Sequence, residues 1–585
     1  MDSENQAIPI SSYTSLINGD VGICMSGGGY RAAAFHFGCL DYLNSFGLTE
    51  KLNAISTVSG GTFTGARYAL SRAEDKSFDE FFKAFYKSLN NTNLVADGLE
   101  RLAHKENKVS SNRQDLIVSM AQVYANTFFC KEDKSPYYFG DILNADNAGA
   151  LKNVVLNTTD FRSGLAFRFQ RTETFDGKIG NFYNNISKED AAQIRLSDIV
   201  AASSCFPGGF EPISFPYDFT WQNEEIPATV TSSFPFKRDY SDPTAPKGPI
   251  GLMDGGVFDN QGLQSLLTIE EKNPDDFDVL IISDVDQPSL TLYQMPLPED
   301  AGGLSLNTIS RMAKAFVVLC GITLITILYH AVQDWQTDQW SWERFVFLYS
   351  IPFILTTVAS TAVYFIYTII RDDVLPKIPS VGERAWDSLK KLKFGQIRAM
   401  INLRFGSLMT LTTSVFMKRI RSLVYGLAYN THDSLSKNKR ISNLIYTLSP
   451  SKTISPPFPA VEKPSTELNK VACVAFNMGT TLWFDKEYEL PCLVAAGQAS
   501  LCYNLLKLMA RRLGQDPQLY SPECKAEYDK LLSDWQSFNK DPFFALKQHQ
   551  VKEDWLAIHE AVKKMECEWG MFEHRTASLQ DVELT

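Results

Sequence analysis

The sequence lacks an excess of basic residues. Across 585 residues, 56 lysines and arginines are outnumbered by 67 aspartates and glutamates, which gives a net charge of −11. Nucleic-acid phosphates are bound by a basic face, so no nucleic-acid partner is predicted. Hydrophobic residues at 44% and charged residues at 21% are typical of a folded protein and not of a disordered one.

Paired cysteines and a secretion signal are also missing. No two cysteines form a C-x-x-C pair, so we predict no zinc site, no redox motif and no cofactor held by cysteine. Several cysteines lie in apolar runs, where this residue is usually a small buried hydrophobe, and we therefore expect a reducing compartment. The N-terminal residues MDSENQAIPISSY lack the basic and then apolar pattern of a signal peptide. The ten cysteines are Cys24, Cys39, Cys130, Cys205, Cys320, Cys473, Cys492, Cys502, Cys524 and Cys567.

What the chain does have is concentrated in the stretch 21–61, which has the pattern strand, glycine turn, helix, strand, sharp turn. Residues 21–25 and 54–58 are short apolar runs typical of buried strands. Residues 31–43 carry alanines and apolar side chains at helical spacing, so a helix is expected to begin at the glycine turn.

Two features of this stretch indicate chemistry. Gly27, Gly28 and Gly29 let the backbone turn tightly and leave N–H groups pointing outward at the start of a helix. Ser59 follows the second strand and precedes Gly60 and Gly61, which is where a nucleophile elbow has its serine. Backbone donors and an exposed serine are the two parts that acyl transfer needs.

Further along, predicted strands alternate with predicted helices. The strand at 249–253 delivers Asp254 at its end, and the strand at 278–285 is almost continuously apolar, as parallel sheets prefer. This alternation indicates an α/β layer fold. Other strands are expected at 153–157, 165–170 and 471–477, and helices at 194–204 and 492–509.

Two long uncharged runs interrupt this pattern. Residues 315–332 carry no charge over 18 residues and residues 345–370 carry none over 26, and about 20 apolar residues span a bilayer. Trp335, Trp340 and Trp342 in the loop between them suit a membrane interface. The alternative is a buried helical hairpin in a soluble protein. The basic residues that flank the pair, Arg311 and Lys314 before it and Arg371 and Lys377 after it, predict that both ends and the catalytic portion lie in the cytoplasm.

After the hairpin, residues 394–429 are predicted to be helical and rich in arginine. Their uncharged run at 405–417 is short and contains serine and threonine, so it should not span a membrane. A solvated helix face is the preferred interpretation, and contact with anionic lipid is the alternative. A proline-rich connector follows at 449–464, and a charged helical tail begins at residue 511.

Four motifs together resemble the patatin-like phospholipase family: SGGGYRA, STVSGG, AASSCFP and DGG. The resemblance implies that Gly27, Gly28, Gly29 and Arg31 form an oxyanion hole, that Ser59 is the nucleophile, and that Asp254 is its partner. It covers residues 20–286 and resumes weakly at 471–505, as in a domain interrupted by an insertion. Thr57 departs from the family pattern because it stands where the first glycine of G-x-S-x-G is expected.

The resulting prediction is a three-layer α/β/α patatin-like core with an inserted two-helix transmembrane hairpin and a helical C-terminal tail. We expect a membrane-anchored carboxylic ester hydrolase that cleaves fatty acyl esters of phospholipids through a Ser59–Asp254 dyad, with the bilayer as its partner and no metal or cofactor. The divisions are a lead-in at 1–19, the core at 20–310, the hairpin at 311–372, a helical segment with a returning strand at 373–510, and the tail at 511–585.

Several alternatives stay open at this stage. Thr57 leaves room for an inactive membrane scaffold, and a triacylglycerol lipase or lysophospholipase would have the same motifs. The glycines also fit the dinucleotide pattern G-x-G-x-x-A, but that site needs an acidic residue after the next strand, where Ser59 stands. His432 follows Ser59 and Asp254 in the chain order of a hydrolase triad and is the one serious candidate for a third member.

Overall fold

A computed structural model describes the chain at residues 14–90, 93–103, 115–173, 177–236, 248–273, 277–285, 305–339, 341–368, 391–429, 438–450 and 456–566. The chain divides into two units. The first combines Met1–Leu292 with Thr412–Thr585, and the second is Tyr293–Leu411. His432, the candidate third member of a triad, lies outside the described residues.

One mixed sheet organises the first unit, with the described strands in the order β10-β9-β1-β2-β3-β4-β5-β6. The five strands from β10 to β3 are parallel to their neighbours, whereas β4 and β8 both run antiparallel to β3. The strands are β1 (Asp20–Met25), β2 (Leu52–Val58), β3 (Asn153–Asp160), β4 (Ala166–Thr172), β5 (Ile179–Gly180), β6 (Asn185–Ile186), β7 (Ile213–Phe215), β8 (Ile250–Asp254), β9 (Phe277–Asp284) and β10 (Arg440–Leu444).

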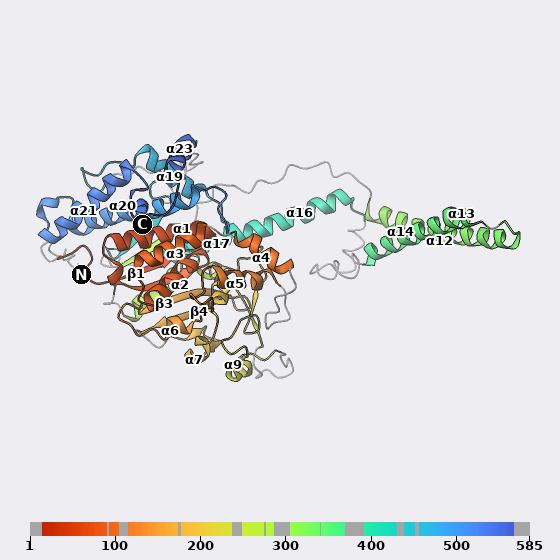
Figure 1. Ribbon diagram of the computed structural model, residues 1–585, viewed down its shortest axis with the longest axis horizontal. Helices are drawn as coiled ribbons and strands as arrows, with labels where there is room; N and C mark the ends of the chain where they lie inside the picture. Colours follow the sequence, from red (N-terminus) through yellow and green to blue (C-terminus); the bar gives the residue numbers. More distant parts are fainter. Residues whose placement is uncertain are drawn as a thin grey trace. The chain divides into compact units, whose positions relative to one another are not determined.

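Helices cover both faces of this sheet (Figure 1). The helices of the first unit are α1 (Gly29–Ser45), α2 (Gly60–Ala73), α3 (Phe78–Asn90), α4 (Leu94–Ala103), α5 (Leu116–Thr127), α6 (Gly140–Leu143), α7 (Lys188–Ala192), α8 (Leu196–Ser204), α9 (Ala228–Ser233), α10 (Gly256–Asp259), α11 (Leu263–Lys272), α17 (Phe416–Tyr429), α19 (Thr466–Asn477), α20 (Glu489–Leu513), α21 (Pro522–Lys540), α22 (Phe544–Gln548) and α23 (Trp555–Lys564). Short 3₁₀ turns lie at Thr49–Lys51 and Pro517–Leu519.

The alternation of side chains along the strands separates two apolar cores. Val21, Ile23 and Met25 of β1 pack with residues of α1, α2 and α20, while Cys24 points to the opposite face, where α11 and α17 pack. Successive side chains of a strand point to opposite faces, so a strand that is buried along its whole length needs cover on both sides. The predicted three-layer α/β/α core is therefore confirmed.

The helix α20 is buried along most of its length because it lies inside this core. A Cβ on Gly38 of α1 would lie 2.1 Å from the Val494 carbonyl oxygen, and one on Gly497 would lie 2.2 Å from the Phe35 carbonyl oxygen. The two helices thus approach closely where both lack side chains. By length and composition Glu489–Leu513 could cross a membrane, but 94% of its apolar window is buried in the first unit.

The prediction of a strand at 471–477 is wrong, because these residues belong to α19. A short run of apolar residues does not distinguish a strand from a buried helix, and the decisive signal lies upstream. Ser465 caps α19 by accepting a hydrogen bond from the Leu468 N–H. The strand that pairs with β9 after the insertion is β10 instead.

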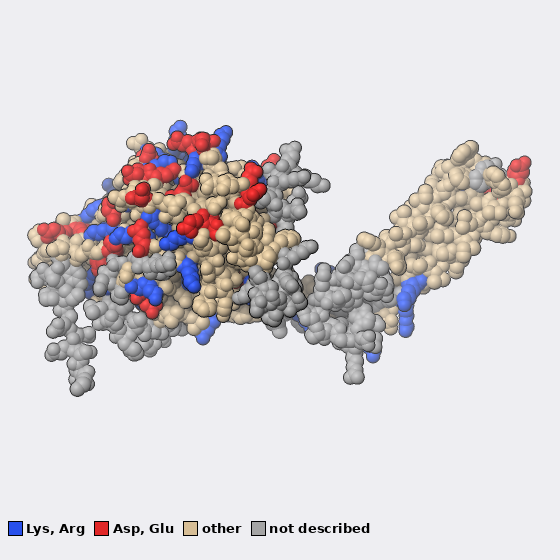
Figure 2. Space-filling model, turned by 90° about the horizontal axis from the view of Figure 1, so that it is seen from below, with Lys and Arg blue, Asp and Glu red and all other residues tan. Residues whose placement is uncertain are grey.

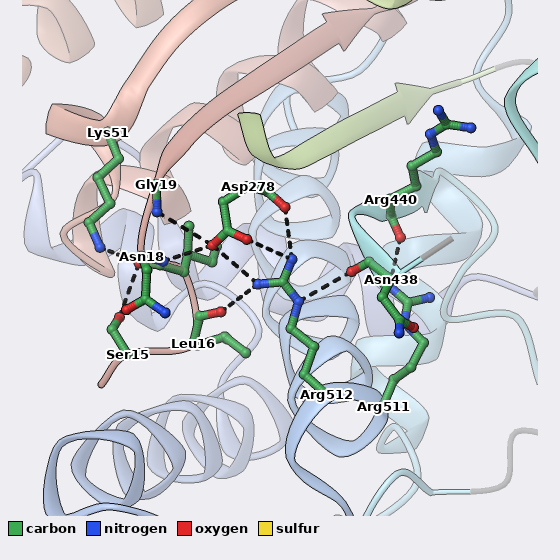
Figure 3. A network of polar contacts seen from close by, with 11 residues as sticks. Ser15, Leu16, Asn18, Gly19, Lys51, Asp278, Asn438, Arg440, Arg511 and Arg512 are labelled. Carbon is green, nitrogen blue, oxygen red and sulfur yellow. Dashed lines mark hydrogen bonds and ion pairs between the residues drawn. The ribbon is translucent and has the colours of Figure 1, made fainter. Parts of the chain in front are cut away.

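A network around Arg512 fastens the amino-terminal ends of the central strands (Figure 3). Its guanidinium donates to the Leu16 carbonyl oxygen at 2.7 Å before β1, to the Asn438 carbonyl oxygen at 3.2 Å before β10, and pairs with Asp278 of β9 at 3.1 Å. The Asp278 carboxylate also accepts from the Asn18 N–H at 2.7 Å. One side chain of α20 therefore joins three segments that are far apart in the sequence.

Replacing Arg512 by alanine should lower the free energy of unfolding by about 2–4 kcal/mol, since it removes a buried cation and leaves the carbonyl oxygens of Leu16, Asp278 and Asn438 without this donor. Denaturant unfolding of the detergent-solubilised chain measures this change. Lys525→Ala is the matched control, because Lys525 makes an exposed pair with Asp529 four residues away and should cost less than about 0.5 kcal/mol. Equal losses in the two variants would contradict the importance of the network.

The second unit contains the predicted hairpin. Its helices are α12 (Leu306–Gln336), α13 (Trp342–Arg344), the π-helical turn Phe345–Ser350, α14 (Ile351–Thr368) and α16 (Phe394–Thr410), and a further π-helical turn, Leu411–Val415, leads into α17. Arg311–Gln336 and Trp342–Phe365 are long and apolar enough to cross a membrane and are almost wholly unburied. Figure 2 shows the middle of this unit without charged residues on the face in view. At the turn, Asp334 accepts from the Tyr349 hydroxyl at 2.5 Å.

Candidate active site

The edge of β3 explains how Ser59 and Asp254 meet. On this edge β2 runs parallel to β3, and its last residue, Val58, pairs with Asn157. On the same edge β8 runs antiparallel to β3, and its last residue, Asp254, pairs with Thr158. The two strands therefore approach head to head, and the residues that follow β2 and end β8 become neighbours although the chain separates them widely.

Ser59 has the strained backbone of a nucleophile elbow. Its φ of 50° and ψ of −119° are rare for a residue with a side chain and cost about 1–3 kcal/mol. The hydroxyl of Ser203 at the end of α8 accepts from the Ser59 N–H at 3.0 Å and donates to the Asn157 carbonyl oxygen at 2.7 Å. Ser203 therefore holds the elbow to β3, and the sequence offered only a small-residue helix as a signal for this role.

The residue Thr57, which departs from the family pattern, is accommodated by a glycine on α2. A Cβ on Gly65 would lie 2.3 Å from the Cγ2 methyl of Thr57, so the methyl occupies the space that Gly65 leaves open. The Thr57 hydroxyl donates to the Val155 carbonyl oxygen at 3.4 Å. The elbow therefore accommodates Thr57, because Gly65 on α2 leaves space for its methyl group.

Gly65→Ala should lower the free energy of unfolding by about 1–3 kcal/mol, because the new methyl overlaps the stiff β-branched side chain of Thr57. A glycine-to-alanine change inside a helix ordinarily stabilises by about 1 kcal/mol, so a loss would have the opposite sign. Adding Thr57→Ser removes the opposing methyl and should recover most of the loss. Thermal unfolding of the two single variants and the double variant measures this coupling, and additive effects would contradict it.

Asp254 is buried beside Ser59. Its Oδ1 accepts from the Gly256 N–H at 2.7 Å. Burial raises the pKa of its carboxyl to about 6, against the lowering effects of the Gly256 N–H and of the Ser59 side chain. A carboxyl with this pKa is ionised at neutral pH.

The glycine loop lies directly against the elbow. A Cβ on Gly60 would lie 2.1 Å from the Gly29 carbonyl oxygen, and one on Gly27 would lie 3.1 Å from the Ser59 Cβ. Gly28 and Gly29 have φ of 148° and 60°, the region that favours glycine. Their N–H groups make no hydrogen bond within the described part of the chain, so they are available to a ligand at the start of α1.

Gly27 and Arg31, which were predicted to line the oxyanion hole, both make hydrogen bonds to other parts of the chain. The Gly27 N–H donates to the Asn260 carbonyl oxygen at 2.9 Å and is therefore occupied. The Arg31 guanidinium donates to the Met478 carbonyl oxygen at 2.9 Å and to the Thr480 hydroxyl at 3.3 Å. Arg31 thus fixes the loop after α19 against the glycine turn.

Two contributions to the site were missed from the sequence. Asn260 accepts from Gly27, and its Oδ1 lies 2.6 Å from the position of a Cβ on Gly256, so it fills the space between the glycine loop and Asp254. The Thr481 carbonyl oxygen accepts from the Tyr30 N–H at 2.8 Å and backs Gly29. A contact between residues 30 and 481 has no local sequence signal.

No described histidine is bonded to Ser59 or Asp254. The ring of His36 lies 2.8 Å from the Ser283 hydroxyl and 3.1 Å from the Ser26 carbonyl oxygen. Burial lowers the pKa of His36 to about 4, so it stays neutral and links the end of β9 to the glycine turn. His549 and His559 contact carboxylates of the first unit, at Asp41 and Glu467. Among the described residues no cluster of His, Cys, Asp and Glu has the arrangement of a metal site.

Comparisons with known proteins give a family match for the segment that carries these residues. A family model described as "Patatin-like phospholipase" matches residues 23–267, a segment that includes both Ser59 and Asp254 and ends within α11. Among solved structures, human GIVD cytosolic phospholipase A2 is similar at 14% identity with a TM-score of 0.28. That alignment covers 46% of this chain and 43% of the other, so the chain matches less than half of that structure's length. A comparison with curated proteins found no match.

Proposed function

Because residues 23–267 are a patatin-like phospholipase domain, we propose that the protein is a membrane-anchored serine acyl hydrolase that cleaves fatty acyl esters of phospholipids. The observation that carries the proposal is the position of Ser59 at a strained elbow beside the buried Asp254 carboxylate, on the same edge of β3 and near enough for the serine side chain to lower the pKa of that carboxyl. A serine hydroxyl is a weak nucleophile until a base takes its proton, and Asp254 is the neighbouring carboxylate.

The reaction proceeds in two steps through an acyl-serine. Ser59 Oγ attacks the ester carbonyl carbon while its proton passes to Asp254, and the tetrahedral intermediate expels the alcohol, which takes that proton. Water then attacks the acyl-serine, with Asp254 again accepting a proton and returning it to Ser59 Oγ as the fatty acid leaves. The pKa of about 6 leaves Asp254 ionised at neutral pH and still basic enough to accept a proton.

The oxyanion of each tetrahedral intermediate needs preorganised donors. The N–H groups of Gly28 and Gly29 stand at the start of α1, against the elbow, and are the donors we assign to it. One such donor contributes about 3–4 kcal/mol in other acyl-transfer enzymes. Arg31 acts as a positioning residue through Met478 and Thr480 in this scheme.

Membrane anchoring completes the proposal. The two unburied apolar helices α12 and α14 are suited to span a bilayer, and the basic residues Arg311 and Lys314 lie in the first turns of α12, ahead of its uncharged run. Lys and Arg flanking a hairpin favour the cytoplasmic side, so we place the catalytic unit in the cytoplasm. A lipid hydrolase held at a membrane would take its substrate from that leaflet.

A fluorophosphonate probe tests the nucleophile. Wild-type protein in detergent should be labelled, Ser59→Ala should not, and Ser45→Ala, at the end of α1, should be labelled like wild type. A wild type that resists the probe would favour the inactive scaffold instead. Incubating both proteins with phospholipid, lysophospholipid and triacylglycerol and measuring released fatty acid then identifies the lipid class, since the three alternatives differ in the ester they cleave.

A further inference from the structure

The helix α17 has two faces with different surroundings. Its inner face is fixed to the strand ends beside the active site, where Val424 and Ala428 are buried. Arg421 donates to the Asp284 carboxylate at 2.9 Å, and the Tyr425 hydroxyl donates to the same carboxylate at 3.1 Å. Asp284 is wholly buried at the end of β9, so this ion pair holds α17 in one position.

The inner face also approaches Gly256, two residues after the proposed base. A Cβ on Gly256 would lie 3.0 Å from the Met417 Cε and equally 3.0 Å from the Asp254 Oδ1. The first turn of α17 therefore lies beside Asp254. A helix with its side chains is about 10 Å across, so a surface that contacts the opposite side of α17 lies about 10 Å from the proposed Ser59–Asp254 pair.

The outer face of α17, defined here as Phe416, Leu423 and Leu427, is apolar and uncovered. The three side chains are 51%, 52% and 61% exposed, and their spacing of seven and four residues places them on one side of the helix. Arg419 lies between Phe416 and Leu423 on this side and is also exposed. Clustered large apolar side chains on a surface mark a contact with a partner or a membrane.

The charge of α17 favours one occupant. The helix FMKRIRSLVYGLAY has no Asp or Glu, and Arg419 is an exposed cation beside its apolar outer face, within a chain of net charge −11. An amphipathic helix with large apolar residues on one side and Lys or Arg beside them binds the interface of an anionic bilayer. From the sequence alone, a solvated face was preferred for this segment and contact with anionic lipid was the alternative.

We infer that the outer face of α17 rests on the surface of an anionic phospholipid bilayer and sets the distance between the lipid interface and Asp254. The inference rests on the proposed function for its biological meaning, although the contact itself can be measured without catalysis. Phe416, Leu423 and Leu427 enter the acyl region, while Arg419 meets lipid phosphates.

Photocrosslinking on the full chain tests the contact. The protein is reconstituted in vesicles of phosphatidylcholine and phosphatidylserine that contain a phospholipid with a diazirine in its acyl chain, and peptides bearing lipid adducts are identified by mass spectrometry. Adducts are expected on α17. Leu519 and Leu556 are 64% and 73% exposed in the C-terminal tail and should carry none, which makes them the matched controls.

The pattern of adducts separates the two proposals. Adducts on α12 and α14 but not on α17 would overturn the inference, leaving solvent or a second copy of the chain as the occupant, and would keep the anchor. Adducts on α17 but not on α12 or α14 would support the inference and overturn the anchor. If α17, α12 and α14 all lacked adducts, both the inference and the proposed membrane anchor would be overturned.

A triple variant, Phe416→Ser, Leu423→Ser and Leu427→Ser, gives a second readout. We expect the ratio of vesicle-phospholipid hydrolysis to soluble short-chain ester hydrolysis to fall about tenfold, since each serine removes apolar area from the lipid contact. The paired control Leu519→Ser with Leu556→Ser should keep the wild-type ratio. A triple variant with an unchanged ratio would contradict the inference. If the wild type hydrolysed neither substrate, the proposed hydrolase function would be refuted instead.

Discussion

Replacing Asp254 by asparagine should abolish most activity and stabilise the fold at the same time. The hydrolysis rate is expected to fall about 10²–10⁴-fold, because the amide does not accept the Ser59 proton. Asparagine is nearly isosteric and keeps an oxygen for the Gly256 N–H, which now donates to Asp254 at 2.7 Å. The loss would therefore report the missing base and not a collapsed site.

The stability gain of this variant depends on pH in a defined direction. Burial raises the pKa of Asp254 from 3.8 to about 6 in the folded state, so the native protein favours the protonated form. The stabilisation from that proton is fully present below about pH 4 and is lost as the pH rises through about 6. Above that, the buried carboxylate costs roughly 2–3 kcal/mol, which asparagine avoids.

Thermal unfolding at two pH values measures the effect. Asp254→Asn should be more stable than wild type at pH 8 and equal to it near pH 4, and wild-type activity should rise with pH through about 6. Asp259 is the matched control, since burial also raises its pKa to about 6 while its carboxylate accepts from the backbone N–H groups of Gln261 and Gln264. Asp259→Asn should keep the activity. Equal activity losses in both variants would contradict the assignment of Asp254 as the base.

Gly60→Ala should have the second-largest effect on activity, through the backbone alone. The new Cβ would lie 2.1 Å from the Gly29 carbonyl oxygen and 2.7 Å from the Gly29 nitrogen, so the elbow and the glycine loop must separate. Because the oxyanion donors must lie within about 3 Å of the developing charge, we expect at least a 10²-fold loss in rate.

The measurement for Gly60→Ala is the rate of fluorophosphonate labelling together with ester hydrolysis. Ser59 is still present, so slow labelling would report a displaced oxyanion hole. Gly149→Ala is the control, because the nearest atom to its new Cβ is Asp75 Oδ1 at 3.4 Å, an ordinary contact. If Gly60→Ala were as active as this control, the close approach of the two loops would be unimportant for the reaction.

Most of the central sheet was predictable because its strands are continuous apolar runs that end in small or polar residues. Residues 21–25, 54–58 and 278–285 became β1, β2 and β9 in this way. The run at 471–477 failed because it is equally apolar and its helical cap stands six residues upstream, at Ser465. β10 was missed because it is short and contains Ser442 and Asn443.

The residues of the candidate site also differ in whether a local sequence signal marks them. Ser59, Asp254 and the glycine turn have local signals, since each needs a particular residue at a strand end. The contacts of Ser203 with Ser59 and of Arg31 with Met478 depend on segments separated by more than a hundred residues, so no pattern along the chain shows them. The availability of the Gly28 and Gly29 N–H groups, against the occupied Gly27 N–H, likewise depends on Asn260.

The position of α17 between β9 and β10 means that this connection has its own crossover helix. Two neighbouring parallel strands always need a crossover, and a helix packed on the sheet is the usual one. In this chain α17 fills that role beside α11. The sheet therefore does not depend on the segment 293–411 for the link between these two strands.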